Sequence, residues 1–252
     1  MKRITLLYSV FALLLAATAC TQDDANQLSE ETEGIPMTFT ATGLTPPAVV
    51  TFATVDGDWA DVTSVAVQIG SEVKEYRVTH SADNLTATLN SDDPHYWKAT
   101  DIVTVSAWWP YTEGETAMPA VIVQADQRGN GYAKSDHIAV VEKQLSYNEG
   151  TPTLDFTHRT ARVSLTLSGT TSDVSFVRLT NLSTANSNPS EIIARDAGSG
   201  TIYEALVAPQ SVAQGTAFVS ISTADGKTYV YRMQADTEWT AGSEYSYAIA
   251  IP

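Results

Sequence analysis

The feature that most restricts the fold of this chain is an alternation of apolar and polar residues along most of its length. Val65, Val67 and Ile69 are separated by smaller or polar residues, and Leu85, Ala87 and Leu89 in turn by threonines. The same alternation returns in residues 103–109, 163–167, 219–221 and 245–251. Because successive side chains of a strand point to opposite faces, this pattern predicts half-buried β-strands. No comparable amphipathic helix pattern occurs.

Turn-forming residues separate these segments. Asp225-Gly226 lies between two apolar runs and predicts a hairpin, since glycine tolerates a positive φ. Other turn sequences lie at 56–58, 90–94, 129–131, 148–150 and 198–200. Many short strands with frequent turns predict an all-β fold built from β-sandwiches.

The first 19 residues have the pattern of an export signal. A basic head, Met1-Lys2-Arg3, precedes a mostly apolar run at 4–15 that is too short to span a membrane stably. Small residues at 16–19 lead to Cys20, the chain's only cysteine. This arrangement resembles the lipobox of bacterial lipoproteins. We predict cleavage before Cys20, acylation of its thiol by chains such as palmitate, and no disulfide within the chain.

Residues 20–35 are polar and acidic, and such a stretch cannot bury apolar surface, so we predict a flexible tether. Acidic residues behind a lipidated cysteine also resemble the signal that sends Bacteroidetes lipoproteins to the outer face of the outer membrane; a linker without a sorting role is the alternative. We predict an N-terminal β-sandwich over 36–150 and a C-terminal one over 151–252, because a turn at 148–152 precedes a long strand run at 153–167.

Composition and motifs exclude several function classes. The chain has 14 Lys+Arg against 29 Asp+Glu, a formal net charge of −15, which opposes binding to nucleic acids and to anionic lipids. Its four histidines are far apart in sequence, and no nucleophile elbow, phosphate loop or dinucleotide fingerprint occurs. We predict no enzyme activity, no catalytic residue, no cofactor and no metal site. Carboxylate pairs from distant strands and calcium ligands in the turns at 56–58 and 92–93 stay open as alternatives.

Tryptophans are the candidate ligand contacts. Trp108 and Trp109 are adjacent, so in a strand they point to opposite faces. We predict that Trp109 packs in a core and that Trp108 is partly exposed. As an alternative, an exposed Trp108 or Trp239 is a possible contact with a glycan or host ligand.

Several segments together resemble the fimbrillin family, the subunits of Bacteroidales type V fimbriae. In the first half these segments are Tyr96-Trp97, the strand at 103–110 and Ser-Asp-His-Ile-Ala at 135–139. In the second half, 154–163 resembles the family's Phe-x-His motif running into a strand, and 208–210, 226–229 and 239–247 are similar to its closing strands.

The resemblance covers about residues 36–252. It implies two tandem transthyretin-like β-sandwich domains, a structural or adhesive role, other fimbrial subunits as partners, and a surface-exposed location at the cell outer membrane. In that family, a protease cuts after an arginine and removes the first strand. The next subunit's C-terminal strand then fills the groove, which is strand addition to a sheet edge.

Two features differ from the polymerising pattern. No arginine lies between Cys20 and Glu75, and both Lys74 and Arg77 fall in an expected strand. The 245–251 strand is followed only by Pro252, which we interpret as no spare segment to donate. We therefore predict an accessory, tip or anchor subunit rather than a stalk subunit, with a displaceable N-terminal strand around residues 37–42. The alternative is a stand-alone surface lipoprotein that binds glycans or host ligands.

Overall fold

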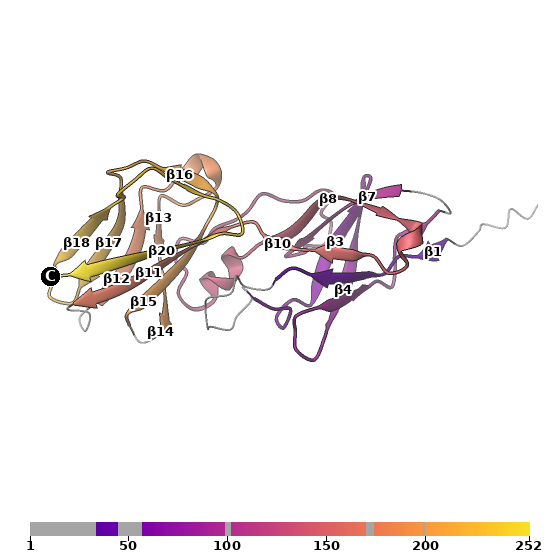
Figure 1. Cartoon of the computed structure of the whole chain (residues 1–252), viewed down its shortest axis with the longest axis horizontal. Coiled ribbons are helices and arrows are strands. Elements are labelled where there is room, and N and C mark those ends of the chain that lie inside the picture. The colour runs from indigo at the N-terminus through magenta and orange to yellow at the C-terminus, as the bar shows by residue number, and fades with distance from the viewer. Residues whose placement is uncertain (1–33, 45–56, 99–101, 170–173, 199) are drawn as a thin grey trace, which may run out of the picture. The chain divides into compact units, whose positions relative to one another are not determined.

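The computed structural model describes residues 34–44, 57–98, 102–169, 174–198 and 200–252. These residues form β-strands joined by turns, which confirms the expected all-β class (Figure 1). Their helices are short 3₁₀ turns: η1 (Gly129–Gly131), η2 (Ala133–Ser135), η3 (Tyr147–Glu149) and η4 (Thr184–Asn186). In this part of the chain no helix has the length and hydropathy needed to cross a bilayer.

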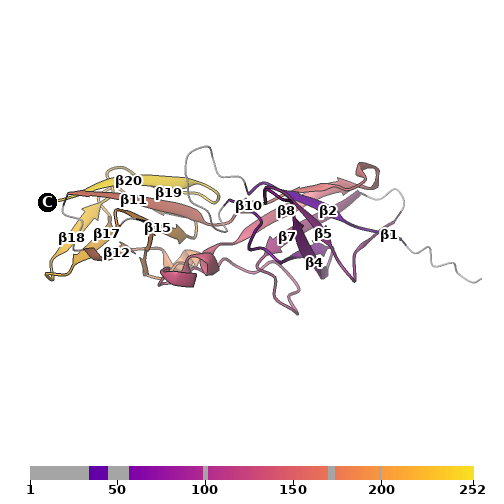
Figure 2. The same cartoon turned by 90° about the horizontal axis from the view of Figure 1, so that it is seen from below.

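Most strands of the first half belong to one eight-stranded sheet. Its order is β10 (Thr157–His158), β8 (Ile138–Ser146), β7 (Ile102–Trp109), β3 (Ser64–Ile69), β4 (Glu72–His80), β5 (Ala87–Asn90), β2 (Phe39–Thr42) and β9 (Thr153–Asp155). Neighbours are antiparallel except β2 and β9, which are parallel. A separate pair joins β1 (Ile35–Pro36) to β6 (Tyr96–Trp97), and Figure 2 shows β1 at the end of this half.

The inward side chains of this sheet form one hydrophobic cluster. Val65 and Val67 are fully buried, as the alternation predicts. Trp59 packs edge-on against Phe156, with ring centroids 5.0 Å apart. A smaller cluster on another part of the sheet contains Ala66, Trp108 and Ala139.

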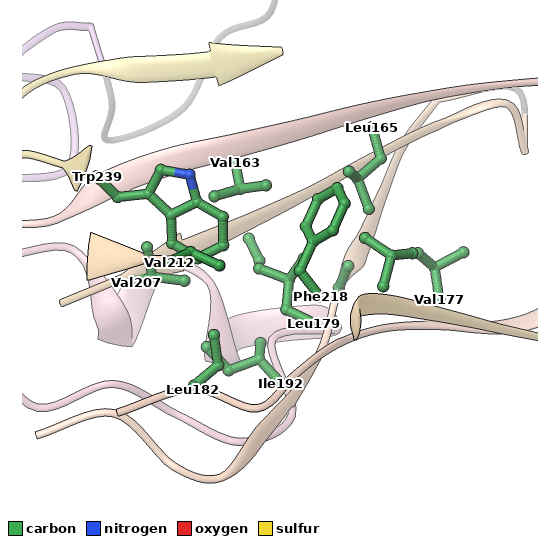
Figure 3. Packing of buried hydrophobic residues seen from close by; sticks show 14 of the residues in the cluster. Val163, Leu165, Val177, Leu179, Leu182, Ile192, Val207, Val212, Phe218 and Trp239 are labelled. Carbon is green, nitrogen blue, oxygen red and sulfur yellow. The ribbon is translucent and has the colours of Figure 1, made fainter. Parts of the chain in front are cut away.

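The second half forms two four-stranded sheets. One has the order β14 (Arg195–Gly198), β15 (Ile202–Val207), β11 (Ala161–Gly169) and β20 (Glu244–Ile251), and the other β13 (Glu191–Ile193), β12 (Val174–Thr180), β17 (Ala217–Thr223) and β18 (Thr228–Arg232). A separate two-stranded sheet joins β16 (Gln210–Val212) to β19 (Thr237–Trp239). Side chains from both sheets meet in one core, where Figure 3 shows Val163 and Leu165 facing Val177 and Leu179. This is a β-sandwich.

Several expectations about single segments can now be compared with the structure. The Asp225-Gly226 hairpin is confirmed: it joins β17 to β18, and Gly226 has φ +83°. The expectation of one long strand over 153–167 is wrong. Two short strands, β9 and β10, and the start of the nine-residue β11 occupy that segment, because the chain changes partner twice, from β2 to β8 and then to β15 and β20. The division between residues 150 and 151 stays a prediction.

Candidate functional site

The predicted displaceable strand is β2, which is paired on both sides within the eight-stranded sheet. Phe39 lies opposite Leu89 of β5, and Ala41 lies between Ala87 of β5 and Leu154 of β9. The sequence expectation of a strand near residues 37–42 is therefore confirmed. Without β2, the facing edges of β5 and β9 would lose their partner. The space occupied by residues 37–44 is called the β2 slot below.

Apolar side chains hold residues 37–44 in the slot. Met37, Phe39, Ala41 and Leu44 are at most 1% exposed. The Phe39 ring contacts that of Tyr76, with centroids 5.4 Å apart. Full burial of a methionine, phenylalanine or leucine side chain contributes about 1.5–3 kcal/mol each. The strand therefore belongs to the core, although it is only four residues long.

Polar contacts hold the C-terminal end of β2 in the slot. The Thr42 hydroxyl donates to Asp155 Oδ1 at 2.6 Å, and Lys143 Nζ of β8 donates to Asp155 Oδ2 at 2.7 Å. The hydrogen bonds from Lys143 and Thr42 hold the pKa of Asp155 below its usual value. One carboxylate thus connects β2, β9 and β8. Nothing in the local sequence marks these three residues, since the contact depends on the pairing of strands far apart in the chain.

Gly43 ends the strand at a point where only glycine fits. Its φ is +96°, and a Cβ there would overlap the carbonyl oxygen of Phe156. The Phe156 amide donates to the Thr42 carbonyl at 2.9 Å, which brings the two segments together. The buried Phe156 of the Phe-x-His segment therefore abuts the end of β2.

The basic residues discussed as cleavage points lie in a central strand. Lys74 and Arg77 belong to β4, which pairs with β3 and β5, so the expectation that they fall in a strand is confirmed. Lys74 is ion-paired with Asp93 at 2.9 Å, and Arg77 is ion-paired with Asp92. Cleavage there would divide the sheet.

The expected exposure of Trp108 is wrong. The ring does point away from the main core, but it is fully buried under Tyr111 and Met118, and its Nε1 donates to Glu115 Oε2 at 2.8 Å. Trp109 packs against the main cluster as expected. The connection between β7 and β8 folds back over the outer face of the sheet, and alternation alone could not predict this cover.

Trp239, the other possible ligand contact, is not exposed either. It is fully buried in the C-terminal core beside Phe218 (Figure 3). Its Nε1 donates to the Tyr247 hydroxyl at 2.9 Å. Neither Trp108 nor Trp239 presents a ring to solvent, so neither can stack on a sugar in this conformation. Cys20 lies outside the described residues. Within those residues, no group of three or more His, Cys, Asp or Glu is placed to hold a metal ion.

Sequence reasoning also missed two buried polar contacts. The carboxylate of Asp136 faces His158, with Oδ1 and Nδ1 2.8 Å apart, and this pair connects the start of β8 with β10. The fully buried Gln127 side chain accepts from the Leu206 amide at 2.8 Å and donates to its carbonyl at 2.6 Å. Gln127 thereby fixes the β7–β8 connection to the edge of β15.

Comparison with known proteins decides the family. The model of a family described as fimbrillin-like matches residues 51–252. The chain belongs to the fimbrillin-like family. The resemblance seen in the sequence segments is thus confirmed, and the fimbrillin-like family places the protein among fimbrial and adhesive proteins of the cell surface. No curated protein matches the sequence.

Solved structures share the fold of this fimbrillin-like chain. A candidate cell adhesion protein of Bacteroides uniformis aligns with a TM-score of 0.59 at 15% identity, over 86% of this chain and 92% of that one. The tip fimbrial protein Mfa3 of Porphyromonas gingivalis, truncated at its C-terminus, aligns with a TM-score of 0.51 at 11% identity, over 87% and 96%. Identities this low show a common fold and carry no more than that.

Proposed function

We propose that this fimbrillin-like protein is a lipid-anchored structural or adhesive subunit of fimbriae, acting as an accessory, tip or anchor subunit at the outer membrane surface. The small residues before Cys20 support the lipid anchor, and the acidic residues behind it support surface sorting. We also propose that residues 36–150 and 151–252 are two tandem transthyretin-like β-sandwich domains. The presence of two large hydrophobic clusters supports two domains, although Leu154 and Phe156 pack in the first cluster and Val123 in the second.

The observation that carries this proposal is the position of β2. It pairs with both β5 and β9, and its side chains fill the β2 slot. A partner strand with apolar residues at alternate positions could replace it and recover the same backbone and side-chain contacts. Strand exchange at the β2 slot is therefore the proposed mode of contact with other fimbrial subunits.

The position of Lys74 and Arg77 supports an end position rather than a stalk position. A trypsin-like protease needs an extended, unpaired segment, whereas both residues lie in a strand that is paired on two sides. Without cleavage at a basic residue before β3, the protein keeps β2 and its slot stays filled. Its slot is then not opened by cleavage, and a donor strand can enter only by displacing β2.

A cut-and-exchange experiment tests the proposal. A variant with a specific protease site between residues 45 and 56 is cut in the folded state, and β2 is released in low urea. A fluorescent peptide with the sequence of residues 36–45 is then added. We expect the cut protein to capture it, and a peptide with aspartate in place of Phe39 and Ala41 to be rejected. Equal capture of both peptides, or of neither, would contradict strand exchange at this slot.

Analysis of the protein from its native cells tests the anchor and the end position. We expect mass spectrometry and N-terminal sequencing to find an acylated Cys20 in a discrete monomer. A new N-terminus beyond Met37 in high-molecular-weight ladders would mean that the protein polymerises as a stalk subunit.

A further inference from the structure

A cleft of about 500 Å³ lies on the C-terminal sandwich, away from the β2 slot. Two strand segments line it: residues 174–177 of β12 and residues 193–196, where the chain passes from β13 to β14. Tyr203 of β15 and, at the start of η1, Arg128 and Gly129 complete the lining. Its volume is within the range of about 300–1,000 Å³ found for small-molecule sites. None of these residues takes part in the proposed strand exchange.

The cleft exists because two strand edges face it. β13 pairs with β12 only at Arg178–Thr180, so the start of β12 extends beyond its neighbour. The chain then crosses from one sheet to the other at Ala194, whose amide donates to the Val177 carbonyl at 2.9 Å. It continues as β14, the outermost strand of its own sheet. Much of the cleft wall, from β12, β14 and β15, is therefore regular strand, and rigid elements of this kind hold binding groups with precision.

Arg128 is fixed at one wall of the cleft. Its Nε and one terminal nitrogen donate to the two carboxylate oxygens of Asp126 at 2.8 and 2.6 Å. Its guanidinium also lies over the Phe176 ring, 5.2 Å from the centroid, while Arg178 lies 4.7 Å from that centroid. Such a bidentate, stacked guanidinium keeps further N–H donors for another ligand. Exposed ion pairs add little stability, so stabilisation does not account well for this arrangement.

Arg195 is fixed on the opposite side. It pairs with the buried Glu204 at 2.7 Å and lies 3.4 Å from the centroid of the Tyr132 ring. The charges of Arg128 and Arg195 are thus balanced by carboxylates, the nearby Arg178 lies 4.0 Å from Glu191, and the exposed Asp196 adds a further negative charge. A strongly anionic ligand would therefore be repelled rather than attracted.

The remaining lining groups combine an aromatic ring with donors and acceptors. Asp196 Oδ1 accepts from the amides of Gly198 at 2.8 Å and Gly200 at 3.2 Å, which holds the carboxylate at the rim. Tyr203 is half-buried at the rim of the core. Burial, with the charge of Asp196, raises the pKa of Tyr203, so its hydroxyl keeps its proton and can donate.

We propose that this cleft is a binding site for a neutral saccharide. A sugar ring presents hydroxyl groups that both donate and accept, and these match the Arg128 guanidinium, the Asp196 carboxylate and the Tyr203 hydroxyl. It also presents an apolar C–H face, which matches the Tyr203 ring. The local charge balance selects against acidic sugars. This inference goes beyond the proposed fimbrial role, because it gives the surface protein a specific adhesive contact.

A glycan array tests the site. The full-length protein is applied to an array of neutral, sialylated and sulfated oligosaccharides, and the spots that bind are then titrated with variants. We expect neutral glycans to bind, and Arg128→Gln and Asp196→Asn each to weaken binding by about tenfold through one lost charged hydrogen bond. Both changes lie on the surface, so the fold is retained, and Tyr203→Ala should abolish binding. Tyr96→Ala is the matched control, because Tyr96 is 48% exposed on the other half of the chain.

Three results would overturn the proposal. Absence of binding to every neutral glycan would remove the site, and binding restricted to sialylated or sulfated glycans would refute the assigned ligand class. Equal binding by the wild type, Arg128→Gln and Asp196→Asn would place the saccharide elsewhere. The peptide capture test of the β2 slot is unaffected by any of these outcomes, so the two proposals fail separately.

Discussion

Replacing Phe39 with alanine tests whether buried side chains hold β2 in its slot. Phe39 is fully buried, and its ring contacts Tyr76 within the main cluster of the first half. Phenylalanine-to-alanine changes at such sites cost about 3–5 kcal/mol, from lost transfer free energy and from the cavity that remains. We expect a loss of about 4 kcal/mol, because β-sheet neighbours on both sides prevent the slot from collapsing.

Urea denaturation measures this loss, and Thr40→Ala is the matched control. Thr40 is adjacent in β2 but half-buried and on the opposite face, so its replacement should cost about 0.5 kcal/mol. The melting temperature of Phe39→Ala should fall by about 10 °C. Amide hydrogen exchange should accelerate first in β2 and in the facing edge of β5, because the hydrogen bonds between these two strands open more often once β2 is held less firmly.

A loss below about 1 kcal/mol for Phe39→Ala, or one equal to that of Thr40→Ala, would refute the reasoning. It would mean that β2 is held mainly by its backbone hydrogen bonds. Replacement by a partner strand would then need no matching apolar side chains, and the sequence pattern of the donor would not matter.

Three further substitutions test the structure around the slot and the fixed connection. Gly43→Ala should lose more than about 1 kcal/mol in urea denaturation, because the new Cβ meets the Phe156 carbonyl at a positive φ. The pKa of Asp155 is depressed in the folded protein. The stability that its ion pair contributes is therefore fully present above the unfolded-state pKa of about 3.9 and is lost as the pH falls through the lower folded-state pKa. Asp155→Asn should therefore cost under about 1 kcal/mol at pH 7, since the carboxylate is largely exposed, and should reduce acid sensitivity in melts below about pH 4. Gln127→Ala should lose about 2–3 kcal/mol, because the Leu206 amide and carbonyl are left buried without that partner; a loss no greater than that of an exposed glutamine would refute this.

The sequence predicts strands better than it predicts partners. Alternation depends on residues two apart, so it identifies 64–69 and 245–251 as strands without knowledge of their neighbours. Pairing depends on segments far apart in the chain. The parallel contacts of β2 with β9 and of β11 with β20 therefore have no local signal. The same limit explains why the sequence predicts one long strand over residues 153–167, whereas the segment belongs to three different strands.

The expectation of a partly exposed Trp108 failed for a physical reason. Alternation correctly placed Trp108 and Trp109 on opposite faces of β7, but it gave no information on what covers the outer face. Tyr111 and Met118 cover Trp108, and they come from a connection with no regular pattern. The saccharide cleft is equally hidden in the sequence, because Arg128 and Tyr203 meet only after the β7–β8 connection reaches the C-terminal sandwich.

The position of β2 explains why the absence of an arginine between Cys20 and Glu75 bears on the proposed role. Strand exchange requires that a subunit first lose its own strand, and loss of β2 would expose the apolar residues that now face Phe39 and Ala41. Exposure of such a slot is costly, so it is tolerated only where a donor strand follows at once. A protein without an accessible basic residue before β3 avoids that cost by keeping β2. The filled slot and the position at one end of a fimbrium are therefore parts of one consistent proposal, and detection of β2 in the protein from native fimbriae would support both.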